Sequence, residues 1–225
     1  MQKLLEIACF NLESVIKAQS AGADRIELCE DYKSGGITPN QNLISEARKL
    51  VSIPIHVIIR PRGGNFVYNE SELHEMQKSI LFCKQNKIDG VVFGILNDNS
   101  EIDKKACQEL VALARPMKVT FHRAFDDVDD QKSEIKKLIE LGFDRLLSSG
   151  GELNASSGAY KLQELQSEFG NKIKIMPGGG IRKSNLRDII NISACSEYHT
   201  AAIVAGHDTL DEKEVKALKH ILSSC

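Results

Sequence analysis

The 225-residue sequence contains no tryptophan, only five prolines and no long apolar run. Its longest strictly apolar stretches are a few residues, far short of the roughly 20 that span a bilayer. Residues 1–10 also lack the basic region and the cleavage site of a secretion signal. We therefore expect a cytoplasmic protein that does not enter a membrane.

A large net charge is absent as well. The 29 basic and 31 acidic residues leave a formal charge of −2. Such a chain has no broad positive field that would attract a nucleic acid or an anionic membrane surface. We expect no partner of either kind, and a ligand must be selected by a local site.

Paired cysteine motifs are also missing. The six cysteines include no CxxC pair and no cluster with histidine, so we expect neither a structural zinc site nor, without an export signal, a disulfide framework. Cys83 and Cys107 fall on apolar helical stripes and are interpreted as core residues.

The pattern that is present is a regular alternation of short strands and helices. Eight short β-branched or apolar runs are interpreted as strands: 4–9, 24–29, 55–60, 89–94, 117–122, 144–149, 172–177 and 197–204. Segments of helical period separate them, such as the stripe Leu73, Met76, Ile80 and Cys83. Capping-box patterns at Asn69 with Glu72, and at Thr209 with Glu212, mark two helix starts.

Strict alternation requires parallel strands with right-handed crossovers. Eight such units in 225 residues approach the ~250 residues of a (β/α)8 barrel. The sequence therefore predicts an α/β fold of the TIM-barrel type. No linker or composition shift divides it, so residues 1–225 are expected to form a single domain; a doubly wound open sheet is the alternative.

Polar side chains gather where these strands end, and the carboxyl ends of barrel strands carry the functional residues. The catalytic candidates, if the protein is an enzyme, are Glu6, Glu27, Arg60, His122, Arg123, Asp126 and His199. His122 or a carboxylate would act as general acid or base. Arg60 and Arg62 would clamp an anionic group.

A glycine run after the seventh strand forms a second candidate feature. Gly178, Gly179 and Gly180 precede a helix, where backbone amides can bind an anion such as phosphate. A simple tight turn is the alternative interpretation.

Cys9 and Cys29 are the candidate metal ligands. They end neighbouring strands that should lie about 4.8 Å apart, and two thiolates at that distance suit Cu(I). Alternation along a strand opposes the pair, because it places Glu6, Glu27, Ala8 and Cys29 inside the barrel and turns Cys9 outward.

The segments LLEIACFNLES, GADRIELC, IPIHVIIRPRGGNFVY, ARPMKVTFHRAFD and IMPGGGI are similar to those of the CutC family. The resemblance covers residues 4–204 and implies a cytoplasmic (β/α)8 barrel with a role in copper homeostasis and Cu(I) bound at cysteines near the first two strands. Cys29 matches one family cysteine, but Ala8 occupies the position of the other and Cys9 comes one residue later. Asn65 replaces the family's aspartate after RPRGG, and the longer loop after the eighth strand is absent.

Three functions remain open. The first is copper binding at the barrel mouth. The second is a lyase, isomerase or hydrolase that acts on a small anionic or phosphorylated metabolite, and the third is a scaffold whose polar residues only stabilise it. Homo-oligomers are common among such barrels, and the sequence identifies no interface.

Overall fold

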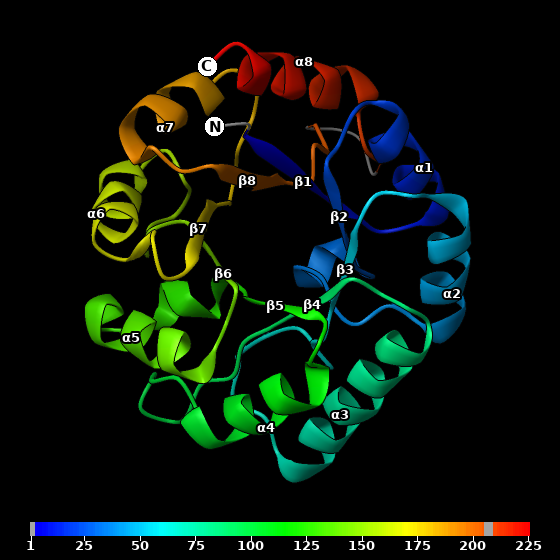
Figure 1. Cartoon of the computed structure of the whole chain (residues 1–225), viewed down its shortest axis with the longest axis vertical. Coiled ribbons are helices and arrows are strands. Elements are labelled where there is room, and N and C mark those ends of the chain that lie inside the picture. The colour runs from blue at the N-terminus through cyan, green and yellow to red at the C-terminus, as the bar shows by residue number, and fades with distance from the viewer. Residues whose placement is uncertain (1–2, 205–208) are drawn as a thin grey trace.

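The structure is a computed structural model that describes residues 3–204 and 209–225. Strands and helices alternate along these ranges, and Figure 1 shows the helices as an outer ring around the strands. The strands are β1 Leu4–Cys9, β2 Arg25–Leu28, β3 Ile55–Ile58, β4 Gly90–Phe93, β5 Lys118–Phe121, β6 Arg145–Ser148, β7 Lys174–Pro177 and β8 Glu197–Thr200. The helices are α1 Leu12–Ser20, α2 Gln41–Leu50, α3 Glu70–Gln85, α4 Lys104–Ala114, α5 Gln131–Leu141, α6 Ala159–Phe169, α7 Leu186–Ser193 and α8 Glu212–Ser223, with short 3-10 turns at Tyr32–Ser34 and Arg123–Asp127.

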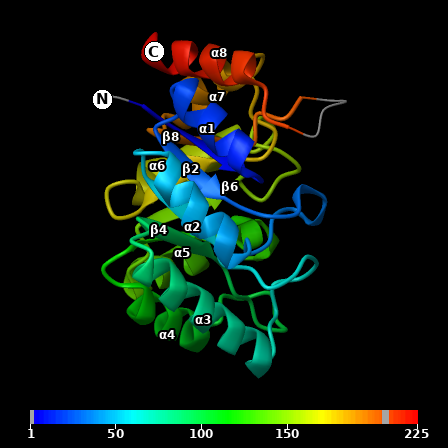
Figure 2. The same ribbon diagram turned by 90° about the vertical axis from the view of Figure 1, so that its right-hand side faces the viewer.

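The strands form one parallel sheet in the order β7-β6-β5-β4-β3-β2-β1-β8. β1 pairs with both β2 and β8, so the sheet curls into a nearly closed barrel. This confirms the predicted (β/α)8 fold and excludes the open sheet. In the side view of Figure 2 the helices pack along the barrel wall, and no helix in the described ranges is long and apolar enough to cross a membrane.

Local sequence signals account for most element boundaries. Asn69 and Glu72 form the predicted capping box at the start of α3, and Met76, Ile80 and Cys83 are buried. The second predicted box was wrong. Asp211 caps α8 instead of Thr209, because its carboxylate accepts from the amides of Lys213 and Glu214, which starts the helix two residues later.

The predicted strands are correct in number and order but too long in places. The last one was predicted to continue to residue 204, yet β8 ends at Thr200. Ala202 adopts a left-handed backbone with φ of 50°, which an extended strand does not contain.

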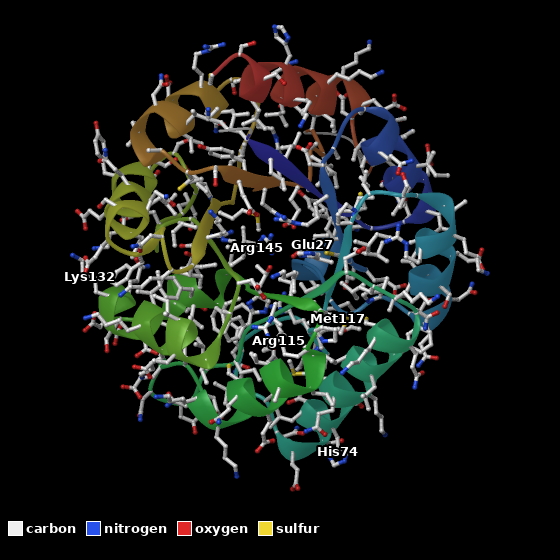
Figure 3. The ribbon with its side chains drawn as sticks, in the orientation of Figure 1. Glu27, His74, Arg115, Met117, Lys132 and Arg145 are labelled. Carbon is white, nitrogen blue, oxygen red and sulfur yellow. The ribbon has the colours of Figure 1, made fainter. Side chains whose placement is uncertain are left out.

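Alternation along the strands sorts side chains into two environments. Leu5, Ile7 and Cys9 of β1 belong to the main apolar core that joins strands and helices, whereas Glu6 and Ala8 face the barrel interior. Figure 3 shows Glu27 and Arg145 within the ring of strands, and His74 and Lys132 at its outside. The inward charged residues must be paired because burial removes their hydration.

A buried guanidinium provides that pairing. Arg25 is 2% exposed; its Nε contacts Glu6 Oε2 and its Nη2 donates to Glu197 Oε2 at 2.7 Å. Arg145 Nε donates to the same Glu197 oxygen, also at 2.7 Å. The Coulomb attraction of Arg25, together with a hydrogen bond from His199, outweighs burial and holds the pKa of Glu6 well below its usual value. The interior of the barrel therefore contains a layer of paired charges.

A missing side chain creates room for His56 beside this layer. His56 is 2% exposed and faces Gly90 across the β3–β4 ladder. A Cβ atom on Gly90 would lie 2.5 Å from the His56 ring, closer than van der Waals contact permits. Gly90 is thus required by its neighbour and not by an unusual backbone conformation.

We predict that Gly90→Ala destabilises the protein by about 1–3 kcal/mol, the usual cost of overpacking a core. The free energy of unfolding, measured with urea, tests this. In a His56→Ala background the same substitution should cost much less, because the ring is gone. Equal costs in both backgrounds would show that the clash with His56 is not the cause.

We also predict an acid-sensitive contribution from His56. Burial and the nearby Arg25 charge lower its pKa from 6.5 to about 3. Between these values the unfolded chain binds a proton that the folded protein does not, so stability falls as pH decreases from about 6.5 toward 3. The effect is on the order of 1 kcal/mol per pH unit.

Urea unfolding at pH 7 and pH 5 measures this contribution. The His56→Gln variant, which has no titrating group there, should lose less stability over this interval than the parent. Parallel losses would contradict the assignment.

Candidate functional site

A pocket of about 120 Å³ opens at the carboxyl ends of the strands. Since a water molecule takes about 30 Å³ in the liquid, the space equals roughly four waters. Its lining combines carboxylate, imidazole and guanidinium groups with apolar walls. The lining residues are Glu27, Gly35, Ile58, Arg60, Phe66, His122, Arg123, Leu147 and His199.

Three of the predicted residues form a buried acid–base chain. His199 Nδ1 lies 2.8 Å from Glu6 Oε1, and its Nε2 lies 3.7 Å from Glu27 Oε2. Glu6 is therefore the link between the ion-pair layer and the mouth. Glu27 is 5% exposed, and no described cation lies within hydrogen-bond distance of its carboxylate.

The environment raises the pKa values of Glu27 and His199. Burial raises the pKa of Glu27, and the negative charge of Glu6 adds to the rise. Burial alone would lower the pKa of His199, but the charges of Glu27 and Glu6 raise it above its usual value. Both groups therefore hold a proton more readily than they would in water.

One ligand atom each from Glu6, Glu27 and His199 lies within 4.8 Å of the others, the spacing of a metal-binding group. Glu6, however, is already bound to Arg25 and to His199 Nδ1. Only Glu27 and His199 Nε2 are directed toward the mouth.

His122 lies opposite these groups and behaves differently. Its Nδ1 accepts a hydrogen bond from the amide of Ala124 at 3.2 Å. Its Nε2 is buried and has no partner among the described residues. Burial and the Arg60 charge lower the pKa of His122 to about 3, so the ring is neutral.

The two arginines of the IRPRGG segment hold loops. Arg60 donates to the carbonyls of Ser34, Gly36 and Gly64 at 2.8–3.1 Å, and its guanidinium lines the pocket above the Phe66 ring. Arg62 does not line the pocket. Its guanidinium is bound by Glu72 and by groups of residues 63–67.

Asp126 positions Arg123. Its carboxylate accepts from Arg123 Nε at 2.7 Å and from the Ser148 and Ser149 hydroxyls at 2.6 and 2.9 Å. Arg123 Nη2 donates to Ser149 Oγ at 3.0 Å, while Nη1 has no acceptor among the described residues. Asp126 is thus a positioning residue rather than part of the pocket lining.

Of the three glycines, Gly179 lies beside Arg123. A Cβ on Gly179 would lie 3.2 Å from Arg123 Cζ and Nη1, so the guanidinium packs against this loop. Gly178 N donates to Ser148 O, whereas the amides of Gly179 and Gly180 find no acceptor in residues 3–204 and 209–225.

The two candidate copper ligands occupy different environments. Cys29 forms a small cluster with Ala8 and Ile58 at the mouth, and its thiol donates to Glu27 Oε2 at 3.3 Å. Cys9 is in the main core and pairs in register with outward Leu28. Burial raises the pKa of both thiols. The two thiols therefore lie in different environments, as alternation along β1 predicted.

Sequence reasoning missed several groups that shape the site. Phe66 packs against both Arg60 and His122, with its ring centroid 4.9 Å from that of His122. It lies in an irregular loop, where no periodicity indicates a buried side chain. Gly94 was also missed. A Cβ atom there would lie 2.6 Å from His122 Nδ1, so the glycine leaves room for the ring.

Comparison with known proteins identifies the family. The CutC family model matches residues 3–204. The human copper homeostasis protein cutC homolog is 41% identical over 199 residues, which cover 88% of this chain and 73% of that protein. A CutC family protein from Chromobacterium violaceum is 41% identical over 202 residues, covering 90% and 82% of the two chains.

Solved structures agree. A CutC protein from Streptococcus agalactiae superposes with a TM-score of 0.85 and 34% identity, covering 88% of this chain and 98% of that chain. Phosphoribosyl anthranilate isomerase from Thermotoga maritima has a TM-score of 0.68 at 14% identity, covering 99% and 100%, and shares the fold alone. The chain belongs to the CutC family.

Proposed function

We propose that this protein is an enzyme that binds a small anionic metabolite at the barrel mouth and transfers a proton to or from it. The observation that carries the proposal is Glu27, a buried carboxylate that lines the pocket and lacks a hydrogen-bonded cation. Such a group costs stability and is the kind of perturbed carboxylate that serves as a general base.

His199 would support Glu27 in this role. Its Nδ1 is held by the ionised Glu6, which leaves Nε2 directed at Glu27. The charge of His199 would stabilise the ionised form of Glu27. Glu6 would orient the ring without contacting substrate, and is a positioning residue.

The anionic group of the metabolite would bind on the other side of the pocket. Arg123 lines the pocket and its Nη1 has no acceptor in the described ranges; the loop at Gly179, whose amide also finds no acceptor there, packs against this guanidinium. A phosphate or carboxylate suits such donors. Asp126 would keep Arg123 in place, and Arg62, bound within its own loop, would not contact the ligand.

Deuterium exchange tests the proposal. In D2O, the protein is expected to exchange carbon-bound hydrogen in at least one of pyruvate, glycolaldehyde phosphate and dihydroxyacetone phosphate, followed by proton NMR. Glu27→Gln should slow this exchange by about 10²–10⁴-fold, the usual contribution of general base catalysis.

Glu168→Gln is the matched control, because Glu168 is on the outer surface of α6 with a 44% exposed side chain. It should exchange at the parental rate. No exchange in the parent, or equal rates in the two variants, would refute the proposal.

Cu(I) binding is the second candidate, favoured by the position of Cys29. Its sulfur and His199 Nε2 lie 3.3 and 3.7 Å from the same Glu27 oxygen, so one soft and one borderline ligand both lie beside Glu27. Cu(I) prefers thiolate and imidazole ligands and would have to displace the thiol proton. The site would then use one cysteine, with the ion as cargo.

A Cu(I) competition titration of the reduced protein against a chromogenic chelator tests this second candidate. We expect Cys29→Ser to weaken binding at least about tenfold, since it removes the soft ligand. Cys9→Ala should leave binding unchanged, because Cys9 faces the core. Loss of binding in both variants would instead indicate a two-thiolate site, and indifference to both would exclude copper from the mouth.

A further inference from the structure

An unpaired hydrogen-bond donor lies in the pocket wall opposite Glu27. His122 is 5% exposed, its ring lines the pocket, and its Nε2 has no partner among the described residues. A buried donor without an acceptor costs about 1–3 kcal/mol. Its retention in a pocket wall is explained if a ligand oxygen accepts the hydrogen bond.

The direction of the ring fixes which atom is the donor. Nδ1 accepts a hydrogen bond from the backbone N–H of Ala124, because an N–H group can only donate. The single proton of the neutral imidazole is therefore on Nε2. Phe66 packs against one side of the ring, and the missing Cβ of Gly94 leaves space at its edge, so the imidazole is held in one position.

Arg60 adds positive charge beside this donor. Both of its terminal nitrogens are occupied by loop carbonyls, which fixes the guanidinium in the wall of the same pocket. A neutral N–H donor and a fixed cation in a buried site favour an oxygen on which negative charge develops.

We propose that His122 and Arg60 form an oxyanion site, and that the substrate is a small carbonyl compound that reacts through an enolate. This inference rests on the proposed function, because Glu27 supplies the base. No lysine among the described residues lines the pocket, so none of these residues can form a Schiff base that accepts the electrons. They must be accepted by the carbonyl oxygen.

The proton transfer is balanced within the pocket. Glu27 takes a proton from the carbon next to the carbonyl, and the C–H electron pair forms a carbon–carbon double bond. The carbonyl π electrons move to oxygen, which becomes the enolate oxygen held by His122 Nε2–H and the Arg60 charge. Return of the proton from Glu27 to the same carbon restores the carbon–oxygen double bond and regenerates the carbonyl compound. No oxidant or metal is consumed.

Oxalate is the probe for this site, because its coplanar oxygens resemble those of the enolate of an oxo acid. Binding of oxalate and of acetate is measured by isothermal calorimetry in the presence of EDTA. His122→Phe keeps an aromatic ring but removes the donor, and should weaken oxalate binding by about tenfold to a hundredfold. Acetate binding should change much less.

Two further variants separate the donor from a general structural effect. His122→Gln, which retains an N–H, should restore much of the oxalate affinity, while His74→Gln on the outer surface should behave like the parent. Thermal unfolding establishes that each variant is folded. Equal oxalate affinity in the parent, His122→Phe and His122→Gln would overturn the inference.

The deuterium exchange assay distinguishes this failure from that of the proposed function. His122→Phe should slow exchange by about 10²–10³-fold, as expected for loss of an oxyanion donor. Exchange that depends on Glu27 but not on His122 would leave the enzyme proposal standing and refute the oxyanion site. Absence of exchange in the parent, with oxalate binding that still depends on His122, would refute the proton transfer alone.

Discussion

Arg25 neutralises two carboxylates in the interior of the barrel, Glu6 on β1 and Glu197 on β8. These strands form the last paired seam of the sheet, and removing one partner of a buried ion pair commonly costs about 3–5 kcal/mol. The same contact keeps Glu6 ionised. Because Glu6 also holds His199, the electrostatics of the packed layer set the orientation of a side chain at the mouth.

The mouth contains histidines of opposite character. On one side, the charges of Glu6 and Glu27 favour a proton on His199. On the other, burial and Arg60 keep His122 neutral. Two histidines of one pocket therefore have pKa values displaced in opposite directions, a pattern typical of sites that assign distinct acid and base roles.

The sequence was sufficient to predict the barrel, because strand and helix periods repeat eight times and the connections leave few topologies. Strand alternation also predicted that Cys9 and Cys29 face different environments. Thr209 was misassigned because Asp211, two residues later, offers a better acceptor. The loop contacts of Arg62 could not be predicted, since they depend on the path of residues 63–67 rather than on any periodic pattern.

Packing partners across strands were the least accessible from sequence. The ladder between β3 and β4 places His56 opposite Gly90, but no local signal links a histidine to a glycine more than thirty residues away. The fit arises only when the register is known.

Two glycines, one at the start of β4 and one directly after its end, constrain how the sequence can vary. Gly90 yields space to the His56 ring and Gly94 yields space to the His122 ring. A side chain gained at either glycine must be matched by a smaller ring or its loss on the neighbouring strand. Among homologous sequences, positions 56 and 90, and positions 94 and 122, should therefore vary as pairs, with the glycine retained wherever the imidazole is.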